Sequence, residues 1–542
     1  MEHFHSKIVS DLVEHLKRMI SETNGITLND TLELSAHSDF VEGNKNISKL
    51  LHEFRLLLSN YQQEEVDILT LLQHPVAEAL SIFFKDFPVT YNEEHTHLTG
   101  SLTAEFVFPR LKVLLDGPHG DIYKKKITDI YGESAIPINS EEDVDKLIRL
   151  AEGEFFDQYL KILTIPKLIL TDKQVHREAA YHMASEIYNK YNVGMLRLKF
   201  TLSRESQSEA EQIPGLENIS GEDVVLGLYE GFQKFREENP RFNFILSPSF
   251  RKESDFFDSS KFSNKEDHFM AQVDYILELI EKYPFLADHL NEVDTVGNER
   301  DLYRKSHFAQ MQYGFRKLHY KGFKIRSHHG ETWHTLRKGV QAVDNAMNIW
   351  HIDTLEHGLS LGVNPNYYFH SLYQRVIRMN RMSRPLAKGS IECNEIIDMD
   401  WYKYNDVRDK LVNGEKLSES ESVIFIKTKF HTAREIEHYQ HDVLNRMITK
   451  GVRLTALPSS NNKLTRYFDD YKDHPFSWWE KKGVRLSVGT DNYVTLNTNF
   501  IREMLILLFS DPDNLKITKL LMVTTGINHR PLISQLLWSM RS

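Results

Sequence analysis

The chain of 542 residues contains a single cysteine, Cys393. One cysteine allows no internal disulfide, and it excludes every zinc site that is built from several cysteines. Zinc deaminases that bind their metal through a histidine and a pair of cysteines are excluded for the same reason. A metal site in this chain would therefore use histidine and carboxylate ligands.

Long apolar runs are also lacking. No stretch approaches the roughly 20 residues that a helix needs to cross a bilayer. The N-terminal segment MEHFHSKIVSDLVEHLKRM differs from a secretory signal, because acidic residues interrupt its apolar positions. We therefore expect no membrane contact and a cytoplasmic location. The formal net charge of −11 is also unfavourable for an open nucleic-acid-binding surface.

The first part of the chain, residues 1–86, is predicted to be a helical region. Apolar residues recur there at helical spacing, as in Phe4, Ile8, Leu12, Leu16 and Met19. A second helical stretch, LLHEFRLLLSNYQQEEVDILTLLQHPVAEALSIFF, follows a polar connection near residues 42–46. No chemical motif stands out in this region, so we expect it to pack against the rest of the protein.

Residues 87–542 show a different pattern, in which short β-rich segments alternate with helical ones. Examples of the β-rich segments are VGMLRLKFTL, FNFILSPS, FKIRSHHG, DTLEHGLSL, VRLTALPSS and VRLSVGTDN. This alternation predicts an α/β fold with a parallel sheet, and the number of units favours a closed barrel. Two intervals rich in helix formers and charge, near 110–190 and 370–445, are predicted to be helical insertions.

Polar residues gather at the ends of the predicted strands. In YNEEHTHLTGSL, His95 and His97 are two residues apart and would point to the same face of a strand. Other strand ends carry His328, His329, Glu331, His357, Asp491 and Asn492. The strand ends of a barrel meet at one face, so these residues need not be neighbours in sequence. Three imidazoles and a carboxylate suit a zinc-like ion.

The order of these motifs, HxH, HxGE, HG, SSN and TD, resembles the adenosine deaminase and AMP deaminase family. The resemblance covers roughly residues 87–510 without the two insertions, and PSSNNKLTRYFDDYKDHPFSWWEKKGVRLSVGTDN is its most specific segment. It implies a (β/α)8 TIM barrel with one zinc ion per chain. It also implies hydrolytic deamination of an adenine nucleoside or nucleotide to the inosine form, with release of ammonia.

Carried over by position, the resemblance makes the metal ligands His95, His97, His328 and Asp491. His329 competes with His328 for one of these positions. Both the family spacing to Glu331 and the alternation along the strand select His328. We expect His329 to be a packed or hydrogen-bonded neighbour.

The resemblance also implies roles for three other residues. Glu331 would donate a proton to purine N1, and His357 would orient or deprotonate the attacking water. Gly297, in VDTVGNERD, would place its backbone near purine N3. A carboxyl group in a closed apolar pocket tends to stay protonated, which suits the role of Glu331.

Two positions depart from the family pattern. Thr99 stands where the family has an aspartate that holds the ribose 5′-hydroxyl, and Asn492 replaces an aspartate that meets purine N7. The amide of Asn492 can still donate to N7. Thr99 favours a substrate with a 5′-phosphate, with ATP or dATP expected. The alternative is that Thr99 hydrogen-bonds the ribose and that adenosine is the preferred substrate. Candidate phosphate ligands are Arg110, Lys112, Arg204 and Arg251.

Two other functions compete with this interpretation. One is a metal-dependent amidohydrolase that acts on a different ring amine or amide, and the other is a non-catalytic scaffold with a decayed site. The presence of all the catalytic positions argues against decay. The long helical additions also resemble those expected of the deaminase subunit of a RADAR-type anti-phage system. That resemblance implies a homo-oligomer and an ATPase partner.

Overall fold

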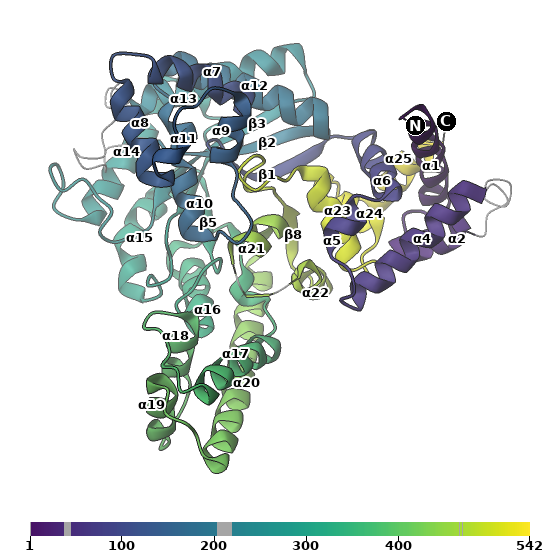
Figure 1. The fold of residues 1–542 in the computed structure, drawn as a ribbon. Helices are drawn as coiled ribbons and strands as arrows, with labels where there is room; N and C mark the ends of the chain where they lie inside the picture. Colours follow the sequence, from purple (N-terminus) through teal and green to yellow (C-terminus); the bar gives the residue numbers. More distant parts are fainter. Residues whose placement is uncertain (1, 37–44, 203–218, 466, 469, 542) are drawn as a thin grey trace.

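The computed structural model describes residues 2–36, 45–202, 219–465, 467–468 and 470–541 (Figure 1). Most of the polar connection near 42–46, the side chain of Phe4 and the whole of Arg204 lie outside the described residues. Among the described helices, none is both long enough and apolar enough to pass through a membrane.

Eight parallel strands form the centre of the molecule, and they follow one another around the sheet in sequence order. Their bounds are β1 Tyr91–His97, β2 Val193–Phe200, β3 Asn243–Arg251, β4 Glu292–Val296, β5 Lys324–His329, β6 Thr354–His357, β7 Arg453–Ala456 and β8 Arg485–Val488. The last strand returns to the first through a parallel bridge between Thr96 and Asp491. The predicted α/β TIM barrel is confirmed.

Helices connect the strands and cover the outside of the barrel. Those between β2 and β6 are α13 Gly221–Glu238, α14 Lys265–Lys282, α15 Lys305–Tyr320 and α16 Leu336–Asn345, and those between β7 and β8 are α21 Pro458–Leu464 and α22 Phe476–Lys481. Because helices cover its outer face, the sheet is buried on both sides, and seven consecutive residues of β3 are buried.

The connection between β1 and β2 is much longer than a single crossover helix. It contains α7 Ala104–Leu115, α8 Gly120–Tyr131, α9 Glu141–Ile148, α10 Phe156–Ile162, α11 Thr164–Leu168 and α12 Lys173–Tyr191. We call this segment, residues 104–191, the first insertion. It lies over the strand ends, where α10 brings Phe156 and Tyr159 against Leu464 and Leu496.

The connection between β6 and β7 forms a lobe that extends away from the barrel (Figure 1). Its helices are α17 Pro365–Arg381, α18 Ile391–Asp398, α19 Asn405–Asn413 and α20 Glu419–Lys450. We call this segment, residues 365–450, the second insertion. Helix α20 begins with a capping box of Ser418 and Glu421, and it ends at Gly451 in the left-handed conformation. The lobe contributes most of a second hydrophobic cluster, which includes Cys393 and also Trp333 and Leu336 from the barrel region.

The helices before β1 share a core with the end of the chain. They are α1 Glu2–Glu22, α2 Leu28–Ala36, α4 Lys45–Gln62, α5 Ile68–Leu72 and α6 Pro75–Lys85, and Figure 1 places them beside α23 Phe500–Ser510, α24 Ile517–Thr525 and α25 Arg530–Ser539. Buried Leu12 and Leu16 belong to the same hydrophobic cluster as Leu520 and Leu537. The N-terminal helices therefore pack on the C-terminal helices of the barrel region.

Candidate active site

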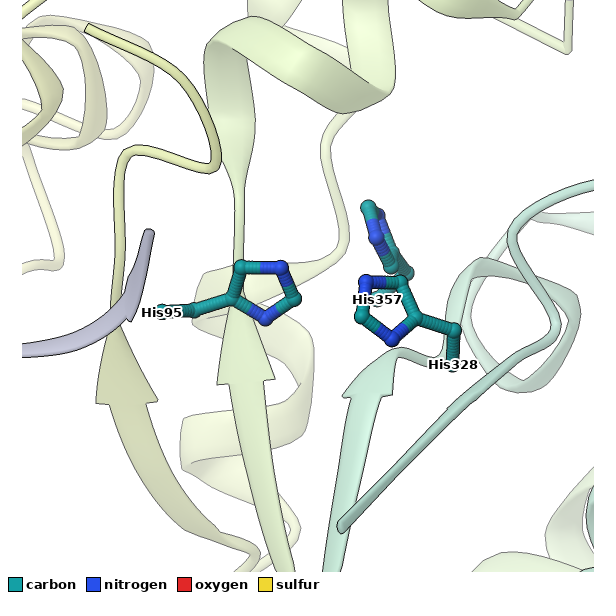
Figure 2. A group of neighbouring side chains, drawn as sticks. All are labelled: His95, His328 and His357. Atoms are coloured by element: carbon teal, nitrogen blue, oxygen red, sulfur yellow. The ribbon is translucent and has the colours of Figure 1, made fainter. Parts of the chain in front are cut away.

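Five predicted site residues meet at the C-terminal ends of four strands. His95 and His97 lie in β1, His328 in β5 and His357 at the end of β6, while Asp491 follows β8. Figure 2 shows the rings of His95, His328 and His357 gathered around one space. All of these residues are buried except His97, which is partly exposed. Four strands far apart in sequence thus supply one cluster.

The donor atoms of the four predicted metal ligands face one another. The Nε2 atom of His97 lies 3.2 Å from that of His95 and 3.3 Å from that of His328. Asp491 Oδ1 lies 3.6 Å from His95 Nε2 and 3.4 Å from His97 Nε2. Ligand atoms at about 2.0–2.1 Å from a tetrahedral metal are separated by about 3.3–3.4 Å. The observed separations fit that spacing.

The outer nitrogens of two of the imidazoles are committed to carboxylates. His95 Nδ1 lies 2.9 Å from Glu356 Oε2, and His328 Nδ1 lies 3.0 Å from Asp294 Oδ2. An ionised carboxylate only accepts, so each Nδ1 carries the proton and each Nε2 presents a lone pair. Two lone pairs and a carboxylate that converge in this way are stabilised by a cation. The residues therefore fit a zinc ion.

Electrostatics hold His97, His328 and Asp491 in the protonation states that a metal needs, whereas for His95 burial and Lys199 would lower the pKa but Glu356 and Asp491 raise it above its usual value. Burial lowers the pKa of His97 to about 3 and that of His328 well below its usual value. Burial would raise the pKa of Asp491, but its hydrogen bond to His95 and the neighbouring imidazoles hold that pKa well below the usual range. Neutral imidazoles and an ionised carboxylate are the forms that bind metal.

The carboxylates behind the ligands are themselves neutralised by buried cations. Glu356 accepts from Lys199 Nζ at 3.0 Å and from Arg326 Nε at 2.5 Å. Lys199 Nζ also lies 3.1 Å from Asp294 Oδ2. Burial would raise the pKa of Glu356, but Arg326, Lys199 and His95 together lower it well below its usual value. This network keeps Glu356 ionised, and the two carboxylates fix the orientation of the two rings.

Two site residues adopt an unusual backbone conformation. His357 and Asp491 have φ values of 67° and 64°, a region that residues other than glycine rarely occupy. Such conformations persist only where surrounding contacts impose them. Ser460 Oγ donates to Asp491 Oδ2 at 2.5 Å, and His357 Nδ1 lies 2.9 Å from Asn461 Oδ1. Both partners belong to the SSN motif, which explains its place in the site.

Glu331 lies beside the cluster with its carboxyl group buried. Its Oε1 is 3.8 Å from His357 Nε2. Burial raises the pKa of Glu331, so the acid form is favoured relative to an exposed glutamate. The backbone N–H groups of Gly330, Glu331 and Thr332 all donate to the carboxylate of Glu299, which anchors this loop. Glu331 is therefore a positioned acid.

His329 faces away from the cluster. Its Nδ1 lies 2.7 Å from Ser327 Oγ, and its ring packs against Phe308 and Trp350 with centroids 5.3 Å apart in each case. Neighbouring side chains on a strand point to opposite faces, which explains why His328 and His329 differ.

A cavity of about 340 Å³ extends from the cluster. His97, His328, Glu331, His357 and Asp491 line its inner end. Thr99 and Gly297 also line it. Gly297 has a φ of 109°, and a Cβ there would lie 2.2 Å from a Glu253 carboxylate oxygen. Only glycine fits at this point of the wall.

Asn492 is not among the residues that line the cavity, although its predicted contact with purine N7 requires it to face the substrate. Its side chain is fully buried, and its Nδ2 donates to Tyr159 Oη at 2.6 Å and to Asp491 Oδ1 at 2.8 Å. Its Oδ1 lies against Gly100. The amide donor that was expected to meet purine N7 is thus already engaged. Binding by Asn492 stays a prediction that would require this amide to turn.

Sequence reasoning missed the first insertion as part of the site. Helix α10 contributes Phe156, Tyr159 and Leu160 to the cavity wall, and the following residues add Leu163 and Lys167. No motif marks these residues, since their position depends on how the insertion folds back over the barrel. The hydrogen bond between Tyr159 and Asn492 links this wall to the strand ends.

The predicted phosphate ligands are not all near the cavity. Arg251 lines it, with its guanidinium paired to Glu253. Arg110 pairs with Glu178 at 2.6 Å, and neither it nor Lys112 lines the cavity. Of the described candidates, only Arg251 is in a position to meet a substrate.

Comparisons with known proteins return structural likeness at low sequence identity. An adenine deaminase from Arthrobacter aurescens matches with 13% identity and a TM-score of 0.47, covering 84% of this chain and 98% of its own. A zinc-bound amidohydrolase from Burkholderia ambifaria matches with 14% identity and a TM-score of 0.48, covering 83% and 92%. The N6-methyl-AMP deaminase from Arabidopsis thaliana matches with 13% identity and a TM-score of 0.46, covering 83% and 96%.

No family model matches the chain, and no curated protein matches it either. The assignment of chemistry therefore rests on the geometry of the site itself.

Proposed function

We propose that this protein is a zinc-dependent hydrolase that deaminates an adenine nucleoside or nucleotide. The observation that carries the proposal is the buried carboxyl group next to the ligand cluster: Glu331 is buried, its pKa is raised by burial, and it lies 3.8 Å from His357. Hydrolysis at an aromatic amine needs a proton donor and a positioned water at the same place. This cavity supplies both.

Zinc, held by His95, His97, His328 and Asp491, would supply Lewis acidity and lower the pKa of a bound water toward about 7. The rest of the chemistry belongs to the chain. Glu331 would protonate purine N1, which draws electron density from C6 and makes it open to attack. His357 Nε2 has no partner in the described structure and faces the same space, so it can accept a hydrogen bond from the water.

The reaction consumes water and releases ammonia. The oxygen of water bonds to C6, the C6–N6 bond breaks, and the protons of water leave with the amine and on the product ring. Adenine becomes hypoxanthine. A positioned acid and a positioned base each contribute about 10²–10⁴-fold to such a step.

The expected substrate carries a 5′-phosphate, with ATP or dATP as the first candidates. Thr99 lines the cavity where an aspartate would repel a phosphate. A like-charge pair at about 4 Å costs roughly 4 kcal/mol at an effective dielectric constant of 20. Threonine removes this repulsion and adds a hydroxyl donor.

Incubation of the purified protein with adenosine, AMP, ATP, dATP and guanine tests the proposal. We expect release of ammonia from adenine compounds, with the product identified by mass spectrometry, and about one zinc ion per chain by elemental analysis. Deamination of guanine alone would favour the alternative amidohydrolase function. No turnover of any compound by the zinc-loaded protein contradicts the proposal.

Thr99→Asp tests separately whether this position selects a substrate with a 5′-phosphate. We expect the preference to shift from nucleotides toward adenosine, measured as the ratio of the kcat/KM values for ATP and adenosine. An unchanged ratio would show that Thr99 does not determine the preference between a 5′-phosphate and a free 5′-hydroxyl.

The comparisons give no support to the RADAR-type anti-phage assembly that the helical additions suggested. A homo-oligomer and an ATPase partner therefore stay predictions. Mass photometry of the purified protein tests the first, and co-purification from the native cell tests the second.

A further inference from the structure

The outer part of the cavity has a one-sided charge. The whole cavity has two acidic lining residues, Glu331 and Asp491, and both lie at the inner end beside the histidine cluster. The lysine and arginine side chains that line it are Lys167, Lys199, Arg251 and Lys265. Lys199 and Arg251 already pair with carboxylates. Lys265 forms no ion pair with a carboxylate among the described residues.

Lys265 is a buried ammonium with an incomplete set of partners. It is the first residue of α14, and its Nζ donates to the backbone oxygens of Arg251 at 2.7 Å and Phe256 at 2.8 Å. An ammonium has three donors, so one remains. In the described part of the chain, no carboxylate is close enough for an ion pair with it. Burial lowers the pKa of Lys265 to about 8, although Glu253 and Asp255 at longer range partly offset this effect.

His268 offers a second unused donor one helical turn further along α14. Its side chain is buried, and its Nδ1 accepts the N–H of Asp258 at 3.4 Å. The proton of the neutral ring is therefore on Nε2, which has no partner among the described residues. Its ring stacks on Phe262, which holds it in place. A buried N–H without an acceptor is costly, so a ligand acceptor is expected there.

Ser249 adds a third polar group to the same cavity. It lies near the end of β3, and its Oγ also lacks a partner in the described structure. Helix α14 has 18 residues, and its N-terminus carries partial positive charge toward this region. The acids of its first turn, Glu266 and Asp267, are exposed and do not line the cavity.

We propose that Ser249, Lys265 and His268 bind a phosphate group of the substrate. A phosphate oxygen only accepts, whereas a ribose hydroxyl would bring a donor of its own and no charge. The anion would complete the hydrogen bonding of Lys265 and His268 and would form the direct ion pair that Lys265 lacks among the described residues. The identity of the ligand as a nucleotide rests on the proposed function, but the binding of an anion here does not depend on turnover.

Two variants test the site through specificity. Lys265→Met keeps the length of the stem and removes the charge, and His268→Phe keeps the ring packing and removes the donor. Each should lower the ratio of kcat/KM for ATP to that for adenosine by about tenfold or more. Lys112→Met, on an exposed lysine of α7 outside the cavity, is the matched control and should leave the ratio unchanged. An unchanged ratio in both cavity variants would overturn the proposal.

Binding of pyrophosphate to the full chain, measured by isothermal titration calorimetry, tests the site without catalysis. We expect binding to the wild type and affinity at least about tenfold weaker in Lys265→Met and His268→Phe. Equal affinity in all three proteins contradicts the proposal. If the wild type binds pyrophosphate at this site but deaminates no adenine compound, the proposed function fails and the anion site stands. Ser249→Ala, the smallest change, replaces any variant whose circular dichroism shows misfolding.

Discussion

Two buried glutamates, one at the barrel strand ends and one in the second insertion, have pKa values that are shifted in opposite directions. At the ends of the barrel strands, Glu356 is surrounded by Arg326, Lys199 and His95, and its pKa lies well below the usual value. In the second insertion, Glu395 accepts only from the N–H of Leu336 and the hydroxyl of Tyr368, and burial raises its pKa to about 8. The charges of the partners, rather than burial itself, decide the state.

The difference in pKa between Glu356 and Glu395 corresponds to two different structural roles. The ionised Glu356 orients a predicted metal ligand, whereas Glu395 caps the start of α16 and thereby ties the second insertion to the loop after Glu331. Asp398 adds to this tie by accepting from Thr335 Oγ1 at 2.8 Å. The strand ends therefore carry the predicted metal ligands, and the second insertion contacts the neighbouring loop from outside.

The largest effect should come from the strand ends themselves. His328→Ala removes a predicted metal ligand and should abolish activity and zinc content, because a missing ligand disrupts the geometry of the site. His329→Ala should be far milder, since this ring packs against Phe308 and Trp350. Zinc content by elemental analysis and ammonia release measure both. Equal loss in the two variants would contradict the choice of His328.

Glu331→Gln should separate proton transfer from metal binding. The amide has the shape of the acid but cannot protonate the purine ring, so kcat should fall by about 10²–10⁴-fold. Zinc content should stay at the wild-type level. A variant that turns over normally would remove Glu331 from the mechanism.

Glu356→Gln should have a smaller effect through His95. The amide keeps a contact to the ring but removes the negative charge that Lys199 and Arg326 share at this position. Loss of a partner behind a metal ligand typically costs about 10–100-fold in metal affinity or activity. Competition with a zinc chelator measures the affinity. An affinity equal to that of the wild type would show that this network only supports the fold.

The smallest effect is expected in the second insertion, and it should appear in stability rather than in activity. Glu395 has an unfolded pKa of about 4.3 and a folded pKa of about 8, so the folded state binds the extra proton between these values. The unfolding free energy of the wild type relative to Glu395→Gln should therefore fall as the pH rises from about 4.3 to about 8, and then level. Urea unfolding at several pH values in this range measures the unfolding free energy of both proteins. A difference between the two proteins that does not change with pH would contradict the raised pKa of Glu395.

Several features of the site could be predicted from local sequence. The HxH spacing on one strand, the alternation that separates His328 from His329, and the polar residues that end β-rich segments all follow from the two-residue period of a strand. The barrel then brings these ends together, because the carboxyl ends of its parallel strands share one face. For this reason His95, His97, His328, His357 and Asp491 could be named before the fold was known.

Other features depended on contacts between distant segments. The sequence predicted an amide donor at Asn492, but whether it faces a substrate is decided by Tyr159, which lies 333 residues earlier. The same holds for Lys265 and His268, whose missing partners become visible only when α14 is placed against β3. Local periodicity determines which elements form and which way their side chains alternate. Only the tertiary structure decides which buried polar atoms find partners, because burial and hydrogen bonding depend on packing between remote parts of the chain.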